Sequence, residues 1–302
     1  MVHIERVSPD EFDWTSEEGA AAEVRRIARA ATAHDGTSTL NEQAVLQLKN
    51  RGLRDASLWL GEGGFALQHG DILDLAVHPE SRRRGVGTAL AAAALPAGRK
   101  VEAWSHADHP GAGLIAAKLG IPRERELQIM RRSLVEELEP VTAPNGVRIR
   151  GFEPSDEKSL LEVNATAFAH HPEQGHMTHE DFTERTSEPW FDPAGLLLAV
   201  PTDTHDTSQP PLLGFHWTKV HSDEDPPYGE VYVVAVNPKA AGRGLGTVLT
   251  RAGLIHLRDQ GLDSVLLYVD GDNAPAIAVY SGQGFHVERT EAQYRGVSTG
   301  LD

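Results

Sequence analysis

Two glycine-containing loops in this chain have the residue types that bind phosphate groups. Residues 82–88 read Arg-Arg-Arg-Gly-Val-Gly-Thr, and residues 241–247 read Ala-Gly-Arg-Gly-Leu-Gly-Thr. Each loop follows an apolar run that ends in Val-x-Pro and precedes a helical pattern. At the start of a helix, unpaired N–H groups and the helix dipole attract anions, and glycine lets the backbone approach closely. Pyrophosphate is therefore the natural ligand of both loops.

The two loops belong to an internal duplication. Residues 71–90 align with residues 230–249 without a gap, at a constant offset of 159 (244 − 85). Farther along, residues 108–120 align with residues 272–284 at an offset of 164 (284 − 120), which places Tyr280 opposite Ala116. A repeat of this length in a chain of 302 residues predicts two domains, expected at residues 1–140 and 141–302.

Hydrophobic periodicity and turn residues predict the same α+β order of elements in both copies. In the first copy we expect helices at 17–33 and 41–51, strands at 56–60, 64–69 and 72–77, a helix after residue 87, a strand at 101–104, a helix at 113–119 and a strand at 126–131. The second copy is expected to have strands at 147–150, 195–200, 212–219, 230–236, 264–269 and 285–295, with helices at 157–169, 246–260 and 274–282. The acidic, proline-containing segment 136–146 lacks periodicity and is expected to be a linker.

Composition excludes several classes of function. The net charge of −16 argues against general nucleic-acid binding, because a phosphate backbone would be repelled. The absence of cysteine excludes disulfides, cysteine nucleophiles and thiolate metal sites, so any thiol in the chemistry must come from a ligand. The fifteen histidines show no metal-ligand spacing, so no metal is expected. No apolar run approaches the ~20 residues that span a bilayer, and residues 1–6 resemble neither a signal peptide nor a lipidation motif. We therefore expect a cytoplasmic protein without a membrane or nucleic-acid partner.

The strand, glycine loop and helix start resemble the acetyl-CoA site of the GNAT acetyltransferase superfamily. In the second copy, Asn273 with Tyr280 and the Gly284-Phe285 pair resembles a later motif of that superfamily. Dinucleotide binding fits less well, because Gly-x-Gly-x-x-Gly spacing and an acidic residue about 20 positions farther on are missing. The resemblance implies two tandem GNAT domains, each with a mixed, mostly antiparallel sheet flanked by helices.

The resemblance also implies which residues hold acetyl-CoA. In the first copy these are Leu75, Ala76, Val77, Arg83, Arg84, Gly85, Val86, Gly87 and Thr88. In the second copy they are Val234, Ala235, Val236, Ala241, Gly242, Arg243, Gly244, Leu245, Gly246, Thr247, Asn273, Ala274, Pro275, Ala276, Ile277 and Ala278. Ala241 departs from the pattern, because the superfamily usually has Gln or Arg there, and this leaves Arg243 and the backbone to hold the pyrophosphate.

In this superfamily an amine attacks the thioester directly, which requires a base, oxyanion stabilisation and an acid for the leaving thiolate. Glu230 is expected to be the base, acting directly or through water, and backbone N–H groups of residues 234–236 are expected to face the acetyl carbonyl. Tyr280 resembles the superfamily's general acid. Ala116 takes that place in the first copy, so we expect one productive acetyl-CoA site in the second copy and a non-productive site in the first.

Segments 171–175, 181–195 and 214–219 are similar to the mycothiol synthases, a family of tandem GNAT enzymes of actinobacteria. This resemblance implies acetylation of the cysteinyl amine of 1D-myo-inositol 2-(L-cysteinylamino)-2-deoxy-α-D-glucopyranoside, the last step of mycothiol biosynthesis. The acceptor contacts that it implies are Asp35, Glu173, Lys219, Glu230 and Tyr268. Their carboxylates suit an ammonium and sugar hydroxyls, and Lys219 and Tyr268 can donate hydrogen bonds. Because Asp35 lies in the first copy, the acceptor pocket is expected to form between the domains.

Two other functions stay open at this point. One is a GNAT enzyme for a different amine, such as a peptide N-terminus or an aminoglycoside. The other is a noncatalytic acetyl-CoA-binding protein, although one copy keeps both Glu230 and Tyr280. We expect a monomer that acts on a small molecule.

Overall fold

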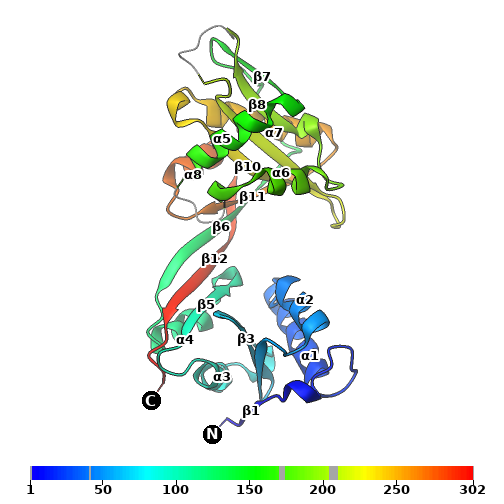
Figure 1. The fold of residues 1–302 in the computed structure, drawn as a ribbon, viewed down its shortest axis with the longest axis vertical. Coiled ribbons are helices and arrows are strands. Elements are labelled where there is room, and N and C mark those ends of the chain that lie inside the picture. Colours follow the sequence, from blue (N-terminus) through cyan, green and yellow to red (C-terminus); the bar gives the residue numbers. More distant parts are fainter. Residues whose placement is uncertain (1, 41, 170–173, 204–209, 302) are drawn as a thin grey trace. The chain divides into compact units, whose positions relative to one another are not determined.

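The computed structural model describes residues 2–40, 42–169, 174–203 and 210–301, and Figure 1 shows its helices and strands. The chain forms two compact units, one of Met1–Leu127 with Arg289–Asp302 and the other of Gln128–Glu288. The expected α+β class and the mixed, mostly antiparallel strand pairing with flanking helices are confirmed. In the part of the chain that is described, no helix is long and apolar enough to cross a bilayer.

The sheet of the first unit has the strand order β1-β2-β3-β4-β5-β12-β6. These strands are β1 (Ile4–Arg6), β2 (Ala56–Gly61), β3 (Gly64–His69), β4 (Ile72–Val77), β5 (Lys100–Ser105), β12 (His286–Val297) and β6 (Arg123–Ser133). Strands β4 and β5 pair in parallel, whereas β1 through β4 form antiparallel neighbours. Helices α1 (Gly19–Asp35) and α2 (Glu42–Arg51) pack on one face, and α3 (Val86–Ala94) and α4 (Pro110–Lys118) pack on the other.

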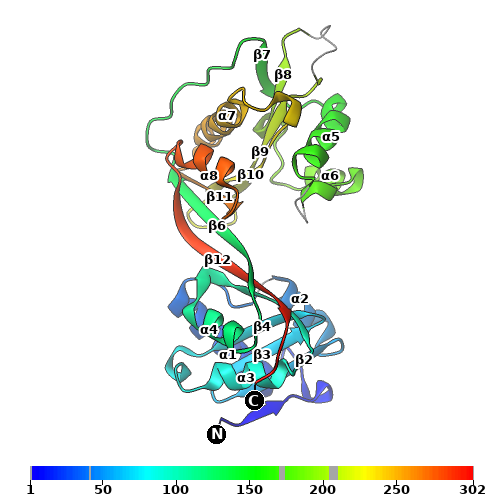
Figure 2. The same ribbon diagram turned by 90° about the vertical axis from the view of Figure 1, so that its left-hand side faces the viewer.

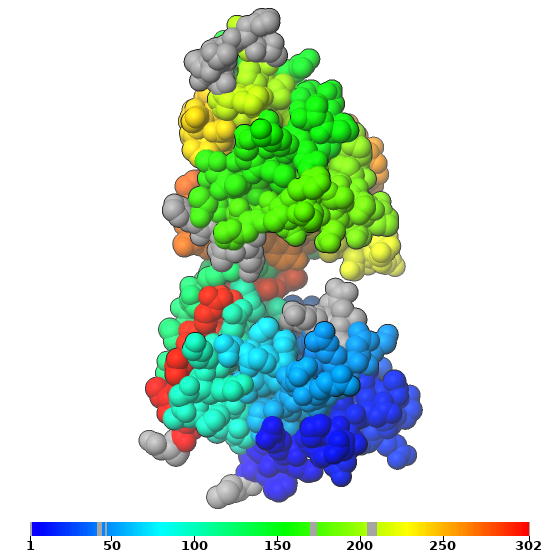
Figure 3. Space-filling model, in the orientation of Figure 1, coloured from blue at the N-terminus to red at the C-terminus, as the bar shows by residue number. Residues whose placement is uncertain are grey.

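The sheet of the second unit continues from β6 in the order β11-β10-β9-β8-β7. These strands are β11 (Ser264–Asp270), β10 (Tyr228–Val236), β9 (Gly214–His221), β8 (Leu196–Pro201) and β7 (Val147–Gly151). Figure 2 shows α5 (Glu157–Ala167) and α6 (His179–Thr186) on one face of this sheet, and α7 (Leu245–Asp259) and α8 (Ala274–Ser281) on the other. Helices α5 and α6, in green, form much of the surface that this unit presents in Figure 3.

The cores show why these units differ from the expected division after residue 140. Leu134 and Leu138 follow β6 and are buried in the core of the second unit. Ala292 and Tyr294, on β12, are buried against α3 and α4 in the first unit. There β12 pairs with β5 in antiparallel register from Ala292 to the end of the strand. Each copy in the sequence therefore gives one segment to the core of the other unit.

This exchange predicts that two aromatic residues near each other in the sequence stabilise different units. Tyr294→Ala removes a buried ring from the first unit and should cost about 3 kcal/mol of unfolding free energy there. Phe285→Ala is the matched change in the core of the second unit. Amide hydrogen exchange should show protection lost in β5 for Tyr294→Ala and in β11 for Phe285→Ala. Loss of protection in the same unit for both variants would contradict the division.

Candidate functional site

Both glycine loops adopt the geometry expected of an anion site. In the first unit β4 leads through a short 3-10 turn to Gly85, which starts α3 with φ 87°. In the second unit β10 leads through an equivalent turn to Gly244, which starts α7 with φ 74°. No side chain caps the first N–H groups of either helix. These amide groups are therefore oriented to receive an anionic ligand.

The loops also share a second residue with positive φ. Gly242 has φ 78°, and Arg83, at the same place in the repeat, has φ 63°. A left-handed conformation is easy for glycine and costs other residues roughly 1–2 kcal/mol. The backbone path of the loop is thus maintained in the first unit although an arginine occupies this position.

Beside each loop, two parallel strands separate. The pairing of β10 with β11 covers Gly229 and Glu230, and that of β4 with β5 covers Ile72. Beyond these residues the strands diverge, so backbone groups of residues 75–77 and 234–236 lack a ladder partner on that side within the described strands. Buried backbone N–H groups require a hydrogen-bond partner. A ligand that enters between the strands can supply it.

In the first unit this separation opens into a cavity of about 810 Å³. It is lined by every residue predicted to hold acetyl-CoA in that copy except Arg84. Apolar side chains from β4, β5 and α4 form most of its wall: Leu73, Leu75, Ala103, Ile115, Leu119 and Ile121. Ala116, which takes the place of Tyr280 in the repeat, also lines it. The predicted residues of this loop are thus brought together around one hollow.

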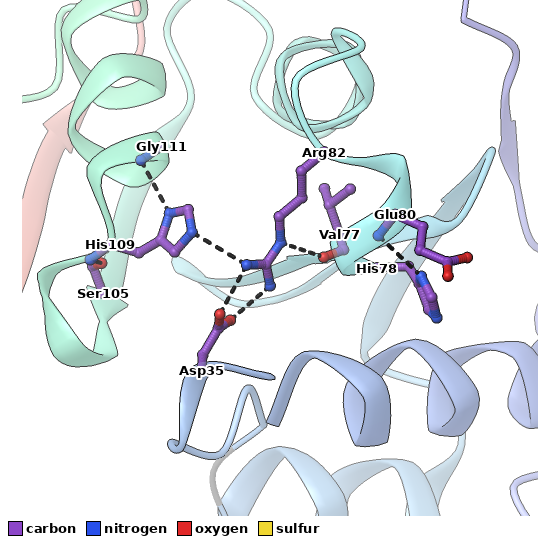
Figure 4. Close-up of polar contacts among 8 residues, drawn as sticks. All are labelled: Asp35, Val77, His78, Glu80, Arg82, Ser105, His109 and Gly111. Atoms are coloured by element: carbon purple, nitrogen blue, oxygen red, sulfur yellow. Dashed lines mark hydrogen bonds and ion pairs between the residues drawn. The ribbon is translucent and has the colours of Figure 1, made fainter. Parts of the chain in front are cut away.

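Asp35 lies at this cavity, and its carboxylate is already paired. Figure 4 shows Arg82 donating two hydrogen bonds to it, with Nη1 at 2.8 Å from Oδ1 and Nη2 at 2.6 Å from Oδ2. The Arg82 guanidinium lowers the pKa of Asp35 and also donates to the Val77 carbonyl at 3.0 Å. Asp35 therefore fixes an arginine of the first glycine loop. The role of Arg82 was not predicted from the sequence, and the acceptor contact of Asp35 stays a prediction.

In the second unit, Glu230 and Lys219 lie directly opposite each other on β10 and β9. Glu230 is buried, and its Oε2 lies 2.6 Å from Nε2 of His221. The His221 ring stacks on Tyr228, with ring centroids 4.5 Å apart. His221, itself stacked on Tyr228, thus contacts the Glu230 carboxylate at the point where β10 leaves β11. His221 was missed in the sequence, where nothing distinguished it from the other histidines.

An aromatic pair surrounds the amine of Lys219. Its Nζ lies 4.9 Å from the ring centre of Trp190 and 5.5 Å from that of Tyr232. Tyr232 sits at a β-bulge, where the register of β10 against β9 shifts between Val231 and Val233. Bulges commonly redirect a side chain next to a functional site. The bulge explains why Tyr232 reaches this face of the sheet and joins Lys219.

Tyr280 lies on α8 and packs edge-on against Phe285, with ring centroids 5.8 Å apart. Burial raises the pKa of the Tyr280 phenol to about 12, so the group keeps its proton at neutral pH and can act only as a donor of that proton. Asn273 starts the same helix, and its Oδ1 accepts a hydrogen bond from the amide of Ala276 at 3.2 Å. The predicted residues 273–278 thus form a helix start in which Ala276 and Ile277 pack on the core and the other four are exposed.

The two remaining predicted acceptor contacts differ in position. Tyr268 lies on β11 and is 46% exposed. Glu173 lies outside the described residues.

Within the described residues, no group of three or more metal-binding side chains comes together. The second unit therefore offers, as candidate site groups, backbone amides, a buried carboxylate with its histidine, a lysine beside two aromatic rings and a protonated phenol.

Comparison with known proteins agrees with this geometry. The acetyltransferase (GNAT) family model matches residues 53–118 and 160–285. The chain is 50% identical to a mycothiol acetyltransferase of Nocardioides sp. over 91% of this chain and 97% of that protein. It is 45% identical to a mycothiol acetyltransferase of Nocardia farcinica over 93% and 96%, respectively.

Solved structures share the fold at lower identity. A GCN5-related N-acetyltransferase from Sphaerobacter thermophilus aligns over 100% of this chain and 97% of its own, with a TM-score of 0.67 and 22% identity. A tandem GNAT protein from the clavulanic acid biosynthesis pathway aligns over 100% of both chains, with a TM-score of 0.60 and 18% identity. Both support the tandem architecture.

The second glycine loop offers a matched pair of substitutions. Gly244→Ala places a Cβ at φ 74° and should lower the unfolding free energy of the second unit by about 1 kcal/mol. Gly246→Ala falls inside α7, where the nearest atom would be 3.9 Å away, and should leave stability unchanged or raise it by about 0.5–1 kcal/mol. Amide hydrogen exchange of α7 measures both. Equal losses would show that left-handed geometry is not the reason for Gly244.

Proposed function

Because the chain belongs to the GNAT family of acetyltransferases and, within it, to the mycothiol acetyltransferases, we propose the acceptor and the residues of its reaction. The protein transfers the acetyl group of acetyl-CoA to the cysteinyl amine of 1D-myo-inositol 2-(L-cysteinylamino)-2-deoxy-α-D-glucopyranoside. Transfer takes place in the second unit. The product is the thiol mycothiol, and the enzyme works as a cytoplasmic monomer.

The observation that carries this proposal is the buried Glu230, which His221 contacts where β10 separates from β11. An ammonium must lose a proton before it can attack a thioester, and a carboxylate fixed within reach can accept that proton. His221 is 23% exposed on its side chain and gives the proton a path toward solvent. We assign Glu230 as the base and His221 as its positioning partner.

Acetyl-CoA is held by the second glycine loop and the start of α8. The amides at the start of α7 receive the pyrophosphate, with Arg243 beside them. Those amides of residues 234–236 that point away from β9, toward the gap, face the acetyl carbonyl oxygen. As the C–N bond forms and the C–S bond breaks, Tyr280 gives its proton to the departing sulfur. The acceptor's hydroxyl groups are bound by Lys219 and Tyr268 of the second unit, and the contacts of Glu173 and Asp35 stay predictions.

The first unit binds acetyl-CoA without turning it over. Its cavity has the lining expected for the cofactor, which supports binding. Ala116 is 6% exposed and offers no proton donor where the second copy has Tyr280. If the CoA sulfur left as a thiolate in the first unit, no side chain at this position could protonate it. The first unit therefore retains the binding part of the site and lacks a catalytic part.

The proposal is tested with the full-length protein, acetyl-CoA and the cysteinyl acceptor, following free CoA and the acetylated product. Turnover is expected, and Glu230→Gln should lower kcat by about 10²-fold or more, because a positioned base contributes that much. The duplication supplies the control. Asp71→Asn changes the equivalent, exposed carboxylate of the first unit and should leave kcat unchanged.

Three results would contradict this assignment. Turnover of peptides or aminoglycosides but not of the cysteinyl acceptor would remove the proposed substrate. Equal loss of kcat in Glu230→Gln and Asp71→Asn would remove the assignment of chemistry to the second unit. Binding of acetyl-CoA without turnover of any amine would indicate a noncatalytic acetyl-CoA-binding protein.

The acid is tested separately. Tyr280→Phe keeps the ring that packs on Phe285 and removes only the proton, so kcat should fall by about 10²-fold while the Kd for acetyl-CoA stays the same. Tyr294→Phe is the control for loss of a tyrosine hydroxyl in the first unit. An unchanged kcat in Tyr280→Phe would mean that another group protonates the thiolate.

A further inference from the structure

A buried carboxylate in the first unit is used neither by the fold nor by the proposed reaction. Asp74 lies on β4, lines the cavity of that unit and has a side chain that is 13% exposed. Its Oδ2 is buried without a hydrogen-bond partner among the described residues, and so is Nε2 of His69, 4.0 Å away. A buried carboxylate oxygen without a donor is unfavourable unless something else supplies one.

The duplication shows that the fold does not require an acid here. At the offset of 159, the residue that corresponds to Asp74 is Val233, which is 5% exposed and packs in the core of the second unit. An apolar residue satisfies this position of the strand when only packing matters. The carboxylate in the first unit therefore points to a ligand.

The neighbouring groups do not neutralise Asp74. Burial lowers the pKa of His69, which keeps that ring neutral at neutral pH. His106 also lines the cavity, but its Nδ1 lies 3.3 Å from the carboxylate of Glu291, on β12, so it already has a counter-ion. Burial raises the pKa of Asp74 to about 6, with the charge of His106 opposing that rise. Arg82 also lines the cavity, but it is paired with Asp35. Above that pH Asp74 is thus a buried negative charge whose neighbour at ion-pair distance, among the described residues, is the neutral His69.

The chemistry of the cavity selects the class of ligand. Its surface is mostly apolar, with Asp74 as a buried anionic group, and no metal-binding cluster exists among the described residues. We propose that the cavity of the first unit binds a small organic amine in its ammonium form, with the ammonium on Asp74 and the alkyl part against the apolar wall. This site goes beyond the proposed function, since acetyl-CoA carries phosphates and no cation for a carboxylate to bind.

The test uses full-length protein freed of bound nucleotide, with butylammonium as the probe and 1-butanol as its neutral counterpart. The Kd is measured by ligand-observed NMR. Asp74→Asn should weaken butylammonium binding about tenfold, because it replaces a charged partner by a neutral amide of the same shape. Asp71→Asn changes an exposed carboxylate at the edge of the same strand and should leave the Kd unchanged.

Binding should also depend on pH with a definite sign. The carboxyl of Asp74 is mostly protonated near pH 5 and ionised near pH 7.5, so butylammonium should bind several-fold more tightly at about pH 7.5 than at about pH 5. In Asp74→Asn this dependence should disappear. The alcohol should bind more weakly than the amine to the wild type, and equally to both proteins.

Three outcomes of the amine measurements would overturn the proposal. They are an unchanged Kd in Asp74→Asn, equal weakening in Asp71→Asn, and equal affinity of the wild type for butylammonium and 1-butanol. Weaker acetyl-CoA binding by Asp74→Asn with unchanged amine binding would also overturn it and assign Asp74 to the nucleotide. Because the readout is binding in the first unit, these outcomes are independent of whether the second unit acetylates its proposed acceptor.

Discussion

The separation of two parallel strands is the constraint on which each unit depends. Parallel strands normally continue to pair until one of them ends, because every buried N–H and C=O group needs a partner. Here β4 and β10 leave their neighbours after a short contact and continue toward a glycine loop. The remaining strand pairs and the helices on both faces must hold the sheet together around this gap. A molecule that offers amide groups and a pyrophosphate can satisfy the exposed backbone along the gap and at its end.

The duplication shows which parts of this arrangement of separated strands and glycine loop differ between the units. The turn and the left-handed loop conformation are the same in both units, even where Arg83 replaces Gly242. The strand differs, because β10 has a bulge that β4 lacks. The side chains around the gap differ: one unit has Ala116 and Asp74, and the other has Tyr280 and Val233. Backbone geometry thus fixes the shape of the site, whereas a few side chains decide what the site does with its ligand.

Much of the fold could be predicted from the sequence because its elements have strong periodic patterns and distinct turn residues. The strands before both loops and the long helix α7 were found with nearly correct ends. Helix α6 was missed, because its polar sequence has a single buried residue, Phe182. Strand β1 was also missed, since three residues of mixed character give no pattern.

The candidate site could be predicted only in part for a similar reason. Glycine loops have local signals, so their residues were found and in the first unit line one cavity. Contacts between residues distant in the sequence have no such signal. The pairing of Asp35 with Arg82 joins two elements 47 positions apart, and the contact of His221 with Glu230 depends on strand register. The bounds of the two units could not be predicted for the same reason, because the sequence repeat does not reveal that β12 completes the core of the first unit.

The contribution of β12 to the core of the first unit affects when each unit can fold during synthesis. Ala292 and Tyr294 fill the core of the unit that contains the N-terminus, and Ser298 donates a hydrogen bond to the Leu95 carbonyl there. A ribosome releases these residues after those of the second unit. The unit that is synthesised first therefore completes its core after the other unit has emerged, and until then β5 has an open edge where β12 will pair. The second unit can thus complete its core before the first unit does, and neither half of the duplicated sequence contains a complete unit.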